Sequence, residues 1–140
     1  MITVNNTALT RSGKAVRGRA LSGRAGHHSE KRESMFKIVK KQPLNPTVTK
    51  MVIEAPLVAR KAKPGQFIIL RVDADGERIP LTVAGTNPEE GTVKIIFQIV
   101  GATTELLNHK NEGESIQDFV GPLGVATHTE GIKKVCIVGG

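Results

Sequence analysis

Apolar and polar side chains alternate along most of the chain after Met35, with the two-residue period of β-strands. The alternation is cleanest in residues 92–100, where every second residue from Val93 to Ile99 is apolar. Prolines and glycines interrupt the pattern at short intervals, as in chains that form several short strands. The pattern predicts six strands, at Phe36–Lys41, Thr47–Ala55, Gln66–Val72, Arg78–Ala84, Thr92–Val100 and Ser115–Val120.

The segments between these strands are mostly turns. Residues 60–65 have the composition of a basic loop that ends in a proline and a glycine, and Asp75-Gly76 is a hairpin signal. A short helix is expected only at Thr103–His109, with Leu106 and Leu107 buried. Six short strands and one brief helix predict an all-β fold, a small closed antiparallel barrel.

The end of the chain has a different pattern. A short apolar strand at Val135–Val138 leads directly into two glycines, as at the start of a parallel βα unit, although a strand that closes the barrel has the same pattern. We expect a barrel domain in residues 35–131, and in residues 132–140 the first strand and glycine turn of an incomplete nucleotide-binding domain. Within that strand, Cys136 is expected to be a buried, unreactive thiol.

Composition narrows the possible classes of protein. The 140 residues include no Trp or Tyr and only four Phe, so the core must be aliphatic. A single cysteine excludes an intramolecular disulfide framework and a cysteine-cluster metal site within this chain. No apolar run approaches the length of a membrane helix. We expect a cytoplasmic protein without a metal site or a membrane partner.

The positive charge is concentrated at the start of the chain. Of the net charge of +7, residues 1–34 carry +5, with seven basic and two acidic side chains, and the rest carries +2. This stretch has little apolar periodicity, so we expect a disordered basic leader. It lacks the apolar region of a secretory signal. A transit peptide and an upstream extension that ends before Met35 are the two remaining interpretations of this leader.

One segment, Arg78-Ile79-Pro80-Leu81-Thr82, combines groups that suit an anionic cofactor. In a strand, Arg78, Pro80 and Thr82 share one face while the residues between them point into the core. Pro80 lacks a backbone donor, which predicts an open strand edge. The arginine fork binds phosphate oxygens in pairs. A solvated barrel edge with an incidental arginine is the alternative.

Two further segments contain glycines at turns. Gly101 precedes Thr103 and Thr104 at the predicted helix start, where backbone amides attract anions. Gly121-Pro122-Leu123-Gly124 is a stiff turn that would lead out of the barrel. Each segment is also compatible with an ordinary helix start or linker turn.

Read in order, five segments resemble the ferredoxin–NADP reductase superfamily, and in particular its small electron-transfer subunits. The resemblance covers about residues 35–140 and implies a six-stranded Greek-key barrel that binds FAD. A nicotinamide-binding domain would follow the barrel. The segments are Pro64-Gly65-Gln66-Phe67, Arg78-Ile79-Pro80-Leu81-Thr82, Gly101-Ala102-Thr103-Thr104, Gly121-Pro122-Leu123-Gly124 and Val135-Cys136-Ile137-Val138-Gly139-Gly140.

The resemblance assigns a role to each candidate site residue. Arg78 would hold the FAD pyrophosphate and Thr82 would hydrogen-bond near flavin N5. The remaining residues would surround the rest of the cofactor: Pro80 and Leu81 beside the flavin and ribityl chain, Gln98, Ile99 and Val100 along the isoalloxazine or ribityl chain, and Gly101, Thr103 and Thr104 at the pyrophosphate and adenosine.

The resemblance also implies a function for the whole protein. It would move electrons between a nicotinamide nucleotide, FAD and an iron–sulfur partner, as one subunit beside a catalytic large subunit. No nucleic-acid partner is expected. This chain departs from the family in two ways: Leu81 stands where many members have an aromatic residue, and no cysteine cluster for a [2Fe-2S] centre is present. NAD(P)H and [2Fe-2S] are therefore expected only in a longer protein.

Two other functions are compatible with the sequence. The chain could be a small basic barrel that binds nucleic acid through residues 1–34, or a truncated product without activity of its own. A barrel that binds FAD explains the order of the five segments, which neither alternative does.

Overall fold

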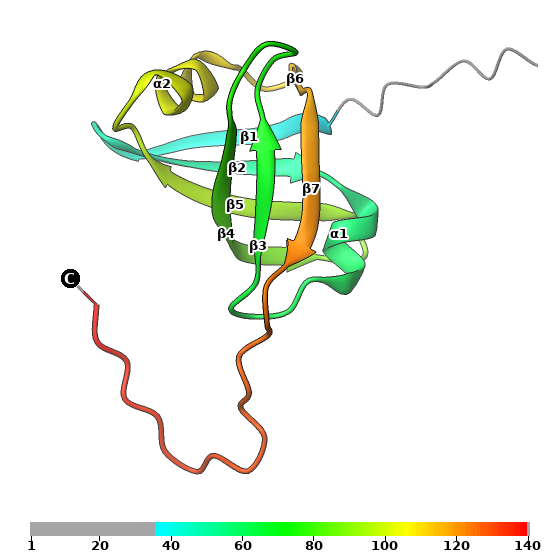
Figure 1. The fold of residues 1–140 in the computed structure, drawn as a ribbon, viewed down its shortest axis with the longest axis vertical. Coiled ribbons are helices and arrows are strands. Elements are labelled where there is room, and N and C mark those ends of the chain that lie inside the picture. The colour runs from blue at the N-terminus through cyan, green and yellow to red at the C-terminus, as the bar shows by residue number, and fades with distance from the viewer. Residues whose placement is uncertain (1–35, 140) are drawn as a thin grey trace, which may run out of the picture. The chain divides into compact units, whose positions relative to one another are not determined.

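The computed structural model describes residues 36–139, and the predicted leader of residues 1–34 lies outside the described residues. The described part forms seven strands and two short helices (Figure 1). In chain order these are β1 (Phe36–Asn45), β2 (Val48–Glu54), α1 (Pro56–Lys61), β3 (Phe67–Arg71), β4 (Arg78–Asn87), β5 (Thr92–Gln98), α2 (Ala102–His109), β6 (Ser115–Ile116) and β7 (Asp118–Leu123).

All neighbouring strands are antiparallel, in the order β6-β1-β2-β5-β4-β3-β7. The first and last strands of this order follow one another in the sequence and are separated only by Gln117. The sheet therefore curls into a nearly closed barrel, in which β3 and β7 cross in front of β1, β2 and β5 (Figure 1). The predicted all-β antiparallel barrel is confirmed.

The predicted sixth strand is two strands, because its sheet partner changes partway along. Ser115 and Ile116 pair with the start of β1, whereas β7 pairs with β3. At the break, the amide of Gln117 donates a hydrogen bond to the carbonyl of Val72 over 3.2 Å. This change of partner brings the two ends of the sheet together.

Two other elements differ from the sequence prediction. Residues 56–61 form a helix, α1, instead of running into a basic loop: Pro56 starts the helix, and its Val58 and Ala59 are buried. β1 continues through Pro43, which pairs with Thr49 of β2. Proline is tolerated there because the other side of β1 is paired only at its first two residues.

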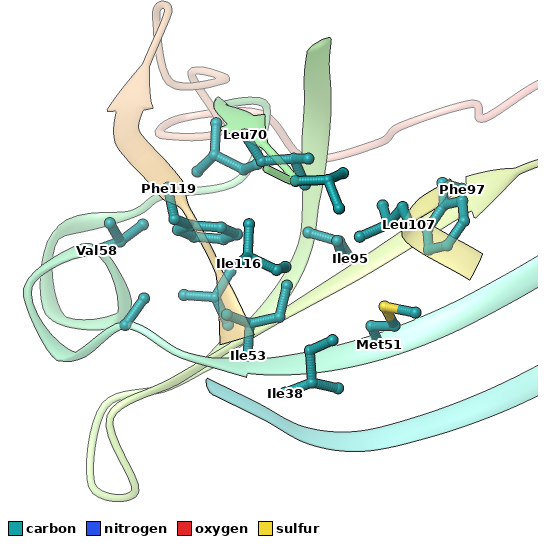
Figure 2. Close-up of a cluster of buried hydrophobic side chains, with 14 of the residues drawn as sticks. Ile38, Met51, Ile53, Val58, Leu70, Ile95, Phe97, Leu107, Ile116 and Phe119 are labelled. Carbon is teal, nitrogen blue, oxygen red and sulfur yellow. The ribbon is translucent and has the colours of Figure 1, made fainter. Parts of the chain in front are cut away.

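The core lies inside the barrel and is aliphatic apart from two phenylalanines, as the composition predicted (Figure 2). The alternation predicted for β5 is confirmed, since Val93, Ile95 and Phe97 are buried. α2 contributes Leu107, which is fully buried, whereas Leu106 is exposed, contrary to expectation. Two polar residues of the described part, Thr49 and Thr92, are buried, and Thr49 donates a hydrogen bond to Oδ1 of Asn108 over 2.8 Å.

After β7 the chain leaves the barrel and continues without helix or strand (Figure 1). The strand expected at Val135–Val138 is not formed, because no other described strand pairs with it. Cys136 is exposed rather than buried for the same reason. The assignment of residues 132–140 to a second domain stays a prediction.

Candidate functional site

The outer face of β4 carries three of the candidate residues. Arg78, Pro80 and Thr82 are exposed, whereas Ile79 and Leu81 pack against the core. The two faces predicted from the sequence are therefore confirmed. The side chain of Leu81 points inward, so only its main chain is available on the outer surface.

β4 has an open edge along its first half. Residues 78–82 pair with β3, but β5 joins β4 only from Val83 onward. The amide of Val83 donates to the carbonyl of Gln66, directly before β3, over 3.1 Å. Because donors alternate along an antiparallel strand, the nitrogen of Pro80 faces away from β3, toward the edge that β5 leaves free. β4 as a whole is an interior strand, and the predicted open edge is limited to this half.

The start of α2 lies beside this open edge. Glu77 and Ile79, at the start of β4, line a shallow depression of about 230 Å³ together with residues 100–104. Between β5 and α2, Gln98 and Val100 are exposed and Ile99 packs against the core. The structure thus brings together two candidate segments that lie about 20 positions apart in the sequence. Such contacts between distant residues are typical of all-β barrels.

Gly101, the N-cap of α2, leaves room for a ligand. Its backbone is extended, with φ of −176°, and a Cβ added there would meet no atom within 4 Å. The fold therefore does not require glycine at this position, and its lack of a side chain leaves the backbone accessible. The amides of the next three residues, Ala102–Thr104, have no intrahelical acceptor, because the first such bond runs from the Glu105 amide to the Gly101 carbonyl. Amides of this kind at a helix N-terminus attract anions.

The hydroxyls of Thr103 and Thr104 have different hydrogen-bond partners. Thr104 Oγ1 accepts hydrogen bonds from the amides of Val100 and Gly101, over 2.9 and 3.1 Å, and donates to the carbonyl of Gly101. Its only donor is therefore engaged in capping α2. The Thr103 hydroxyl instead donates to Oε2 of Glu77 over 3.2 Å, inside the depression. Of these two hydroxyls, only that of Thr103 is not used to cap α2.

The guanidinium of Arg78 is directed away from α2. Nη2 of Arg78 lies 3.2 Å from Oδ2 of Asp118 on β7. Between them in the sheet lies Arg71 of β3, which is in register with both residues, and its Nε lies 2.8 Å from the same oxygen. The side chain of Arg78 is 60% exposed, against 21% for Arg71. Arg78 is thus the more exposed and more weakly held of the two arginines.

The Gly121–Gly124 segment is part of the barrel rather than a linker. It forms the end of β7 and lies against β3, where a Cβ on Gly121 would come within 2.6 Å of Cγ2 of Ile68. The following residues also contact the barrel: the carbonyl of Gly124 accepts a hydrogen bond from Gln66, and the amide of Thr127 donates to the carbonyl of Pro64, both over 2.9 Å.

Sequence reasoning missed the two carboxylates that contact candidate residues. Neither Glu77, which follows the predicted turn at Asp75-Gly76, nor Asp118, which lies within the predicted strand Ser115–Val120, is among the candidate residues. Their partners lie 26 and 40 positions away in the sequence, so no local spacing indicates the contacts. A cross-strand charge pair becomes visible only when the strand register is known.

Within residues 36–139, no group of three or more His, Cys, Asp or Glu side chains is placed to hold a metal ion. In the same part of the chain, none of the helices is long and apolar enough to span a membrane. The features described above therefore define one candidate site, at the open edge of β4 and the start of α2.

Comparison with known proteins finds similarity to electron-transfer subunits of oxidoreductases. No protein-family model matches the chain. Over 107 residues, 76% of this chain and 38% of the relative, it is 46% identical to a dihydroorotate dehydrogenase B (NAD(+)) electron transfer subunit homolog of Thermotoga maritima. It is 57% identical over 91 residues, 65% of this chain and 31% of the relative, to a Clostridium beijerinckii protein named for its position in the adh 3′ region.

A solved structure of an NADH-dependent reduced ferredoxin–NADP oxidoreductase, studied for flavin-based electron bifurcation, matches with a TM-score of 0.66 and 45% identity. The match covers 68% of this chain and 34% of that one. The chain thus spans about a third of the length of these proteins. These similarities confirm the resemblance indicated by the five segments: the chain is similar to electron-transfer subunits of the ferredoxin–NADP reductase superfamily, and its described residues have the antiparallel barrel of that superfamily.

Proposed function

We propose that this chain is the FAD-binding barrel of an NAD(P)H-linked electron-transfer flavoprotein subunit. The supporting observation is the juxtaposition of the open edge of β4 with the start of α2. This arrangement combines an exposed arginine, a proline without a donor, three free helix amides and an uncrowded glycine. Such a surface suits a flat cofactor with a pyrophosphate.

In this proposal, the pyrophosphate lies at the start of α2. The amides after Gly101 and the hydroxyl of Thr103 donate to its oxygens, while Thr104 contributes its amide and keeps its hydroxyl on the helix cap. Arg78 turns from Asp118 to the phosphates and binds them through its fork.

The outer face of β4 would hold the flavin and ribityl chain. Thr82, which is exposed, would hydrogen-bond near flavin N5, Pro80 would support the cofactor from below, and Leu81 would contribute its main chain. Gln98 and Val100 border the cofactor from the end of β5, and Ile99 supports them from the core side. When bound, FAD supplies the redox chemistry, and the barrel positions it.

The function of the longer protein is part of the proposal. By similarity to the electron-transfer subunits, it would pass electrons between NAD(P)H, FAD and a [2Fe-2S] centre, in a cytoplasmic heterodimer with a catalytic large subunit. The relatives are about three times as long as the part they share with this chain. Residues 132–140 would be the start of the nicotinamide-binding domain.

The test is a titration of the purified chain with FAD, followed by the visible flavin absorbance of the retained complex and by thermal unfolding. Binding predicts a yellow protein whose unfolding temperature rises with FAD concentration, because a ligand that binds only the folded state stabilises it. ADP should compete, since it carries the pyrophosphate. A chain that stays colourless and gains no thermal stability at saturating FAD contradicts the proposal.

A further inference from the structure

We infer that two carboxylates of this chain, those of Glu77 and Asp118, occupy the phosphate-binding groups of the flavin-free barrel and compete with the pyrophosphate for them. This inference rests on the proposed function, because it assumes that FAD binds at β4 and α2. It adds two residues that set the affinity and selectivity of the site and that do not themselves bind the flavin.

The first carboxylate lies at the start of α2. Oε2 of Glu77 accepts a hydrogen bond from the hydroxyl of Thr103 over 3.2 Å, and both residues line the depression next to the free helix amides. A carboxylate there is favoured by the partial positive charge of the helix N-terminus, as a phosphate would be. A bound phosphate would meet a like charge, so Glu77 must turn away when the ligand binds.

The second carboxylate holds the arginine. Asp118 lies 2.8 Å from Nε of Arg71 and 3.2 Å from Nη2 of Arg78. When Arg78 leaves, Asp118 keeps the closer and more buried of its two partners. Releasing Arg78 from Asp118 also costs little free energy, because the Arg78 side chain is 60% exposed and an exposed ion pair contributes little to stability. Asp118 thus holds Arg78 over β3 only by a weak contact.

Both contacts concern only the phosphate end of the cofactor. Neither Glu77 nor Asp118 lies on the outer face of β4 around Pro80 and Thr82, where the isoalloxazine ring would lie. The competition therefore weakens ligands that carry phosphate and leaves riboflavin unaffected. It also keeps single small anions out, because one inorganic phosphate gains too few contacts to displace two carboxylates.

The experiment compares Glu77→Gln, Asp118→Asn and the double variant with the wild-type full chain, by fluorescence titration with FAD and separately with riboflavin. Each single substitution should lower the Kd for FAD about three- to tenfold, the size of one weak charged contact, with riboflavin unchanged. Asp73→Asn is the matched control. It removes the same charge from an ion pair with Lys110, 3.1 Å long, that contacts neither Arg78 nor Thr103.

Several results overturn the inference. An unchanged or weaker FAD affinity in both Glu77→Gln and Asp118→Asn shows that the carboxylates do not compete. An equal gain in Asp73→Asn reduces the effect to overall charge, and an equal gain for riboflavin removes the link to phosphate. If Asp118→Asn unfolds because Arg71 loses its partner, Glu77→Gln decides alone. Absence of FAD binding in every variant contradicts the proposed function instead.

Discussion

The hydroxyl of Thr104 binds both main-chain groups of Gly101, accepting from its amide over 3.1 Å and donating to its carbonyl over 2.9 Å. This pair starts α2 without any side chain on Gly101. It leaves the amides of α2 and the space in front of Gly101 open. The same contacts that stabilise the helix therefore also shape the proposed phosphate site.

Replacing Gly101 with alanine separates ligand binding from folding. A Cβ at Gly101 meets no atom of the protein, and the extended backbone suits any residue. We expect the free energy of unfolding to fall by about 1 kcal/mol or less, because alanine is a poorer N-cap than glycine but meets no clash at this position. FAD affinity should fall several-fold, because the added methyl occupies space that the phosphate needs. Chemical denaturation and FAD titration of the same preparation measure both effects.

The neighbouring threonines form a matched pair of variants. Thr104→Val removes the cap of α2 and should destabilise the fold by about 1 kcal/mol. Thr103→Val loses only an exposed hydrogen bond to Glu77, so its stability should stay within about 0.5 kcal/mol of wild type, while its affinity for FAD falls. Urea denaturation distinguishes the two variants. Equal stability losses would show that both hydroxyls are structural.

Arg78→Ala should weaken FAD about tenfold or more, because a charged, forked contact to phosphate is lost. Its effect on folding should be small, since its contact with Asp118 is exposed. Arg78→Lys should give an intermediate affinity, because it keeps the charge but not the fork. Isothermal titration and thermal unfolding test these expectations. Parallel losses of affinity and stability would assign Arg78 a structural role.

Gly121→Ala should destabilise the barrel by about 1–3 kcal/mol, because the new methyl forces β7 away from β3. The added Cβ would lie 2.6 Å from Cγ2 of Ile68, which is fully buried. Gly101→Ala is the control glycine, since it adds the same methyl in open space. A loss of stability no larger than that of the control would mean that β3 and β7 separate easily at this point.

Much of the barrel is predictable from local patterns. The two faces of β4 and the inward residues of β5 follow from alternation alone, because each strand has one face on the core. Local patterns do not predict the change of sheet partner at Gln117, which depends on where β1 and β3 lie. Nor do they predict α1. A proline in its first turn, taken alone, indicates only the end of a strand, and the helix is recognised only once the burial of Val58 is known.

The candidate site is predictable to a similar degree. The sequence identifies Arg78 and the segment at Gly101 because the residue types suit an anion. It does not separate Thr103 from Thr104, since both are threonines at a helix start and only the hydrogen bonds of the fold distinguish them. It also misses Glu77 and Asp118, because electrostatic partners across a barrel are set by strand register.

The pairing of β1 with β6, which closes the barrel, has a consequence for when the strands can pair during synthesis. Phe36 pairs with Ile116, and its ring lies 5.6 Å from that of Phe119. The contacts of β1 on this side therefore cannot form until β6 and β7 are present. Closure is a long-range contact and must follow release of β7 from the ribosome. Until then one edge of β1 is bare, and its lysines together with Pro43 hinder pairing with another nascent chain.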